Sequence, residues 1–130
     1  MTKNEEIVRH AMQVIWNECN VSRVGEFYSE DFKADYPHTN WGLGLQGISL
    51  LAAQVHKDLP NYEENIEELI DAGDKIIVTL AISGNHPSNG DKISFRDVTI
   101  LTLKNGKIIS QSGVGDLLTL YVKLGMIDFP

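Results

Sequence analysis

The chain lacks several features that would define its class at once. It has a single cysteine, Cys19, among 130 residues, so no disulfide can form within it. It has no apolar run long enough to span a membrane, and its first residues are polar and acidic, unlike a secretory signal. No Lys or Arg cluster offsets a formal net charge of -7, which argues against nucleic acid or an anionic membrane as partner. We therefore expect a cytoplasmic protein.

The length favours one domain spanning residues 1–130, without repeats, linkers or low-complexity tracts. A chain of this size buries about two-thirds of its unfolded surface when it folds, which is enough for a real core.

Helical patterns occupy the first part of the chain. Thr2 and Glu5 have the spacing of a capping box, and an apolar stripe follows them. Ser22 marks the start of a short helix that ends near Asp31. A third helix follows the glycines near residue 44 and ends at Pro60.

Strand patterns dominate the second half. Three runs rich in β-branched residues, 75–83, 93–103 and 107–114, are separated by turn clusters, and the turn at Asn105-Gly106 is typical of a two-residue hairpin. Residues 32–36 form a further short strand, whereas residues 62–70 fit a helix and a strand equally well. Helices followed by a meander of strands predict an α+β fold, with the helices against one face of a curved antiparallel sheet.

Several short motifs occur in an order that is more specific than any one of them. They are Ile15-Trp16-Asn17, Gly47, Leu59-Pro60, Ala72-Gly73-Asp74-Lys75, Gly84-Asn85-His86, Asn105-Gly106-Lys107-Ile108, Asp116 and Leu124-Gly125. Through them the chain resembles the SnoaL-like polyketide cyclases and ester cyclases of the nuclear-transport-factor-2-like superfold. The resemblance implies a cystatin-like roll: a cone-shaped, curved antiparallel sheet wrapped around a long N-terminal helix, with an apolar pocket at its open end. It also implies that residues 62–70 are a strand.

The resemblance assigns catalytic roles to two residues. Asp116 matches the aspartate that the cyclases use as acid and base in an intramolecular aldol closure, provided that an apolar pocket raises its pKa. The alternative is that Asp116 only N-caps a terminal helix over 117–124. His86 matches the family's Gly-x-His motif, which implies that it steadies the developing oxyanion; the alternative is a histidine on a solvated turn.

A pocket for substrate is expected around four further residues. Trp16 is expected to face the pocket from the long helix, Tyr36 to line it, His38 to lie near its mouth, and Trp41 to line it and cover it from a Gly-rich loop.

Other site classes have weaker support in the sequence. Arg96-Asp97 raises the possibility of water activation as in the limonene epoxide hydrolases, but neighbouring strand residues point to opposite faces. A salt bridge on the strand face, or a place in a dimer interface, is the simpler expectation for both. The histidines and Asp116 lack the spacing of a metal site, so we expect no metal and no cofactor.

One position departs from the family pattern. Ser112 stands where the cyclases carry a tryptophan four residues before the aspartate, which is expected to change the shape and polarity of the pocket. Gly113 and Gly115 suggest a bent or bulged strand end that would re-aim Asp116.

The sequence therefore predicts a homodimeric, cofactor-independent isomerase or cyclase, with a lyase-type aldol step as one form of the reaction, acting on a small, largely apolar carbonyl compound. The main alternative is a non-catalytic binding or dimerisation domain that keeps the pocket without the chemistry.

Overall fold

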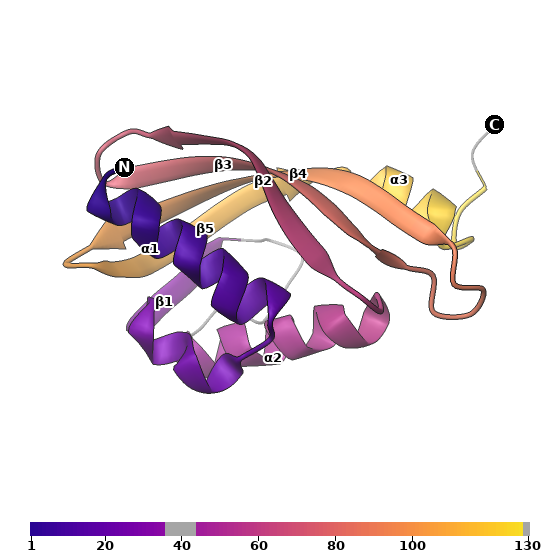
Figure 1. Ribbon diagram of the computed structural model, residues 1–130, viewed down its shortest axis with the longest axis horizontal. Coiled ribbons are helices and arrows are strands. Elements are labelled where there is room, and N and C mark those ends of the chain that lie inside the picture. Colours follow the sequence, from indigo (N-terminus) through magenta and orange to yellow (C-terminus); the bar gives the residue numbers. More distant parts are fainter. Residues whose placement is uncertain (36–43, 129–130) are drawn as a thin grey trace.

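A computed structural model describes residues 1–35 and 44–128. Its five-stranded sheet, in the order β1-β5-β4-β3-β2, arches over helix α1 and helix α2, while α3 lies at the end of the sheet near the C-terminus (Figure 1). The α+β fold predicted from the sequence is confirmed. The elements are α1 Lys3–Ala11, the π-helix η1 Met12–Asn17, the 3-10 helix η2 Val21–Glu26, β1 Tyr28–Asp35, α2 Gly44–Asp58, β2 Glu63–Asp71, β3 Lys75–Asn85, β4 Lys92–Lys104, β5 Lys107–Gly115 and α3 Leu117–Lys123.

The first helix begins as predicted, because the Thr2 hydroxyl accepts a hydrogen bond from the N–H of Glu5 at 3.2 Å. It then continues without a break into η1, whose wider turn shifts the direction of the side chains that follow. As a result Met12, Ile15 and Trp16 are all buried against the sheet. In the part of the chain that is described, no helix is long and apolar enough to cross a membrane.

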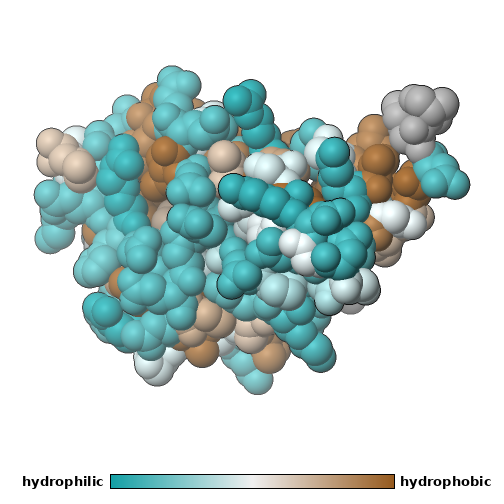
Figure 2. Space-filling model, turned by 45° about the vertical axis from the view of Figure 1, so that its right-hand side comes forward, coloured by the Kyte–Doolittle hydropathy of each residue, from teal (hydrophilic) through white to brown (hydrophobic). Residues whose placement is uncertain are grey.

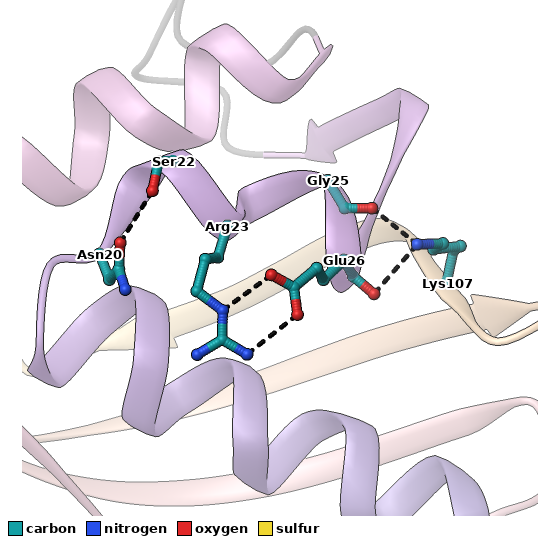
Figure 3. Close-up of polar contacts among 6 residues, drawn as sticks. All are labelled: Asn20, Ser22, Arg23, Gly25, Glu26 and Lys107. Carbon is teal, nitrogen blue, oxygen red and sulfur yellow. Dashed lines mark hydrogen bonds and ion pairs between the residues drawn. The ribbon is translucent and has the colours of Figure 1, made fainter.

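The second helix is shorter than predicted. It spans Val21–Glu26, and β1 already begins at Tyr28, where a helix was expected to continue to Asp31. Pairing of Tyr28 with Ile108 on β5, together with burial of its ring against Phe32, overrides the local helical pattern. Figure 3 shows how η2 is held: the ammonium group of Lys107 donates to the carbonyls of Gly25 at 2.6 Å and Glu26 at 3.0 Å.

The sheet is an antiparallel meander from β2 to β5, and residues 63–71 are indeed a strand. In the turn, Asn105 has a φ of 52° and Gly106 a φ of 77°, so both backbones are in the left-handed region, as the hairpin sequence predicts. The expectation of a wholly antiparallel sheet is wrong at one edge, because β1 runs parallel to β5. This pairing joins segments about 80 residues apart, which local turn signals cannot reveal.

The glycines near the end of β5 do not form the predicted bulge. Pairing stays regular at Thr99–Gly113 and Asp97–Gly115, and the only shift between β4 and β5 lies at Thr102 and Leu103. Glycine is needed for close approach instead. A Cβ on Gly113 would lie 2.4 Å from the carbonyl oxygen of Val98, and one on Gly115 would lie 2.7 Å from the carboxylate of Asp97.

The close approach at Gly113 gives a stability prediction. Gly113→Ala drives its methyl group into a backbone oxygen that is fixed by the sheet, so we expect a loss of roughly 1–3 kcal/mol in the free energy of unfolding. Gly25→Ala is the matched control, since its Cβ would meet only a methyl group of Leu45 at 3.5 Å. Urea unfolding measures both variants, and equal stability of the two would refute the steric explanation.

Candidate active site

A cavity of about 160 Å³ lies between the helices and the inner face of the sheet. Alternate residues of four adjacent strands point toward it, as strand geometry requires. Most of its wall is apolar, and its polar groups cluster on the sheet side. The strand residues are Glu64 on β2, Leu80 and Ile82 on β3, Asp97 and Thr99 on β4, and Gln111, Gly113 and Gly115 on β5; Met12, Trp16, Leu51, Val55, Tyr62 and Leu117 complete the lining.

Glu64 is the most buried acidic group in this cavity, with 8% of its surface exposed. Burial raises the pKa of its carboxyl to about 7; a hydrogen bond from the Tyr62 hydroxyl to Oε2 opposes the rise, and the negative charge of Asp97 adds to it. Near neutral pH Glu64 is therefore present in both the protonated and the ionised form. A group in that state can act as a general acid or a general base.

Asp97 is the second carboxyl group of the cavity. The Thr99 hydroxyl donates to its Oδ1 at 2.7 Å, and partial burial raises its pKa in spite of that bond. Gly115, which is paired with Asp97 across the strands, leaves the space that this carboxylate occupies. Across the sheet Glu64 and Asp97 are two strand spacings apart, and along it they are offset by two residues, so their backbones lie ~12 Å apart.

Glu64 is fixed in place by the end of the first helix. The side-chain amide of Asn17 donates to the carbonyl of Glu64 at 3.0 Å and accepts from its N–H at 2.7 Å, as a neighbouring strand would. The carbonyl of Trp16 lies 2.5 Å from Nε2 of His56, whose ring packs edge-on against Tyr62. Both partners of the Tyr62–Glu64 hydrogen bond are thus held by contacts with η1 or α2.

The four residues predicted to surround substrate are only partly described. Trp16 lies in the wall of the cavity, and its indole N–H donates to the Tyr28 hydroxyl at 2.8 Å, which fixes the plane of the ring. Tyr36, His38 and Trp41 fall outside the described residues. Their predicted roles remain predictions.

Asp116 lies outside the cavity lining. It is the N-cap of α3, and its exposed carboxylate accepts from the N–H of Thr119 at 3.1 Å and from the Thr119 hydroxyl at 2.6 Å. Those two bonds lower the pKa of Asp116, the reverse of what a base for carbon acids needs. The geometry thus matches the capping alternative, and the catalytic role of Asp116 stays a prediction.

His86 lies at the end of β3, where both of its ring nitrogens are engaged. Nδ1 accepts from the N–H groups of Ser88 at 3.0 Å and Asn89 at 3.3 Å, so Nε2 carries the proton and faces the carbonyl of Leu124 at 3.2 Å. This arrangement ties the end of α3 to the turn after β3. Oxyanion stabilisation by His86 would require at least one of these bonds to break.

Arg96 and Asp97 point to opposite faces, as strand alternation predicted. Arg96 is exposed on the outer face and pairs with Glu67 at 3.3 Å. The expectation that Asp97 is also a surface or interface residue is wrong, because it lines the cavity. The sequence carries a signal for this placement, since Asp97 falls in phase with the inward residues Ile93 and Leu101.

The sequence interpretation missed Glu64, although it lies two residues from both Tyr62 and Ile66 and so shares their inward-facing side of the strand. A carboxylate in phase with the buried side of a strand was the available signal. Ser112 does not line the cavity, and the predicted effect of a serine in place of the family's tryptophan stays a prediction. The cavity is lined by Gln111 and Gly113 on either side of it, so Ser112 faces away, in register with Ile100.

A metal site is not formed by the described part of the chain. Within residues 1–35 and 44–128, no three His, Cys, Asp or Glu side chains are grouped so that they would hold a metal ion.

The fold and the cavity together define a class: small α+β domains in which a curved sheet and its helices enclose an inner site. The model of the SnoaL-like polyketide cyclase family matches residues 6–124, and the chain belongs to that family. No protein of curated function matches the sequence.

Solved structures agree with this assignment. A protein assigned as a polyketide cyclase in Bacillus cereus is 28% identical, with a TM-score of 0.88 over 98% of this chain and 83% of the other. One assigned likewise in Acidithiobacillus ferrooxidans is 19% identical, with a TM-score of 0.89 over 98% and 97%. A SnoaL-like polyketide cyclase of Agrobacterium tumefaciens is 17% identical, with a TM-score of 0.78 over 96% and 100%. The nuclear-transport-factor-2-like fold expected from the sequence is confirmed.

The raised pKa of Glu64 predicts a specific pH dependence of stability. The native state holds this proton up to about pH 7, whereas the exposed carboxyl group of the unfolded chain, with its ordinary pKa of 4.5, releases it near pH 4.5. The stabilisation is therefore complete below pH 4.5 and is lost as the pH rises through 7, by on the order of 3 kcal/mol. We expect Glu64→Gln to abolish this component, so that the variant gains stability relative to the wild type at pH 8.

Urea unfolding of both proteins between pH 4.5 and 8.5 measures this difference. Glu63→Gln, at the neighbouring exposed position on β2, controls for the loss of one negative charge. Parallel pH curves for wild type and Glu64→Gln would contradict the assignment.

Proposed function

We propose that the protein is a cofactor-independent cyclase or isomerase that moves protons on a small, largely apolar carbonyl compound bound in the cavity. The observation that carries this proposal is the placement of two carboxyl groups, both with raised pKa, in one largely apolar chamber. Membership of the SnoaL-like polyketide cyclase family supports the same reaction class.

The two carboxyl groups suit different roles. Asp97 is the less buried of the two, so burial opposes its ionisation less, and we assign it the role of taking the proton from the carbon next to the carbonyl. Glu64 in its protonated form donates to the oxygen that gains negative charge. Because the Tyr62 hydroxyl donates to Oε2, Oε1 is the oxygen that carries the proton of Glu64.

The same proton transfers serve two overall reactions. In an aldol closure, the enolate carbon formed by Asp97 attacks a second carbonyl of the same molecule, and Glu64 protonates the resulting alkoxide. In an isomerisation, Asp97 returns its proton to a different carbon. After the aldol closure Asp97 holds a proton and Glu64 has lost one, so Asp97 releases its proton to water and Glu64 takes one up before the next turnover. Neither reaction requires an oxidant.

Enolisation can be tested without knowing the natural substrate. Cyclopentanone in deuterated buffer exchanges its α-protons when a base removes them, and proton NMR follows the loss of signal. We expect the wild type to catalyse this exchange, and Asp97→Asn and Glu64→Gln to lower its rate by a factor of roughly 100 or more.

Asp116→Asn tests whether the base is Asp97 or Asp116. If Asp116 acts only as a helix cap, its variant keeps most of the exchange rate and loses about 1 kcal/mol of stability or less. Loss of exchange in Asp116→Asn, with retention in Asp97→Asn, would restore the role inferred from family resemblance. Binding of the ketone by the wild type without any exchange would favour a non-catalytic binding domain.

We also propose a homodimer through the outer face of the sheet. Val98 on β4 is paired with Val114 on β5, and both are exposed apolar residues, by 43% and 79%; Ile70 on β2 is exposed by 46%. Such residues on an outer sheet face favour a sheet-to-sheet contact.

Sedimentation of the wild type and two variants tests the dimer. We expect Val98→Asp to be monomeric, because a carboxylate would be buried without a partner in the interface. Leu50→Asp introduces the same charge on α2, where the wild-type side chain is 58% exposed, and should remain dimeric. A monomeric wild type would rule the proposal out.

A further inference from the structure

A second hollow opens from the candidate active site and runs along the molecule between α2 and α3. We call it the outer groove, and its volume is about 760 Å³. It shares part of its lining with the inner cavity, namely Leu51, Val55, Tyr62, Ile82, Asp97 and Leu117. The two spaces are therefore neighbours, and they approach each other beside Asp97, a carboxyl group of the candidate site.

The shape of the outer groove follows from the helices that form its sides. On α2 its lining runs from Leu51 to Asp58, about 10 Å of helix axis, and on α3 from Leu117 to Tyr121, about 6 Å; Leu59 and Leu124, just beyond the two helices, continue it. The groove is thus elongated, with one end at Asp97 and the other near Leu124. The bond between His86 and the carbonyl of Leu124 holds that far end in place.

The walls of the groove are suited to a neutral, apolar group. Most of the residues that line it are apolar, among them Leu59, Phe95 and Leu120; its charged residues are Asp58 and Asp97, and no Lys or Arg is among the described residues of the lining. The far end continues into exposed apolar residues, including Tyr121 and Met126. Figure 2 shows apolar residues gathered at this end of the molecule.

The inner cavity is too small to hold a drug-sized molecule by itself. Sites for drug-sized ligands have volumes of about 300–1,000 Å³, whereas the inner cavity has only about 160 Å³. A molecule that places its carbonyl group between Glu64 and Asp97 fills this chamber with its reacting end. Any larger part of it has to extend past Asp97 into the groove.

We propose that the outer groove binds an unbranched apolar tail, so that the substrates are carbonyl compounds with an acyl or alkyl chain and not compact polycyclic molecules. This inference rests on the proposed function for the position of the reacting end. The groove supplies affinity and substrate selection, while the inner carboxyl groups supply the proton transfers.

A series of 2-alkylcyclopentanones, with side chains from methyl to hexyl, tests the tail site by calorimetric titration of the full chain. We expect the affinity to rise about threefold to fourfold with each added methylene, as for a CH₂ group that leaves water completely. The same compounds are assayed for deuterium exchange at the ring carbons. An affinity that does not change with chain length would overturn the tail site.

Two variants locate the tail along α3. Leu120→Asn makes the groove wall polar, so the affinity for the ketones should rise less than twofold with each added methylene. Leu118→Asn is the matched control on the same helix, because Leu118 is 46% exposed and does not line the groove. An equal loss in both variants would also refute the proposal.

Two further measurements distinguish a loss of tail binding from a loss of folding, and the tail site from the proposed chemistry. Met126→Asp changes a groove residue that is 69% exposed, so it should lower tail affinity without unfolding the protein if Leu120→Asn proves unstable. Affinity that depends on chain length without deuterium exchange would support the groove and reject the proposed chemistry. Exchange with no dependence on chain length would reject the groove and support the chemistry.

Discussion

The contact between the end of the first helix and strand β2 is the constraint on which the site depends. Asn17 forms two hydrogen bonds with the backbone of Glu64, at an edge of the sheet where the strand's N–H and C=O groups would otherwise lack a neighbouring strand. This contact holds the end of η1 against β2, beside the cavity that Trp16 and Glu64 both line. The direction of the Glu64 side chain follows from the orientation of the strand that Asn17 holds.

The π-helix η1 makes the contact possible. An α-helix continued through Asn17 would turn its last side chains to other directions, whereas the wider turn brings Trp16 to the cavity wall and Asn17 to the edge strand. Single π-turns are frequent at functional sites, where their cost in helix stability is offset by the placement of particular side chains. In this molecule the placement concerns both the wall of the cavity and its most buried acid.

The sequence predicted the architecture better than the site, for a physical reason. Hairpin turns such as Asn105-Gly106 and caps such as Thr2 are local, so the chain reports them directly. The parallel pairing of β1 with β5 and the π-turn depend on distant contacts. Glu64 and Asp97 had a local signal, their phase within alternating strands, but an acid at such a position is easily taken for a surface residue until burial is known.

A comparison of Glu64 with Asp116 shows why the requirements of stability and of proton transfer differ. A carboxyl group in an apolar cavity destabilises the folded state when it is ionised, and selection for stability alone would replace it with an apolar residue or expose it. Glu64 is still an acid and is still buried. Asn17 bonds to its backbone, the Tyr62 hydroxyl bonds to its side chain, and burial raises its pKa to about 7. Asp116 illustrates the opposite solution, an exposed carboxylate that stabilises a helix end and has a lowered pKa. Proton transfer near neutral pH needs the first kind of carboxyl group, and the described residues place it inside the cavity.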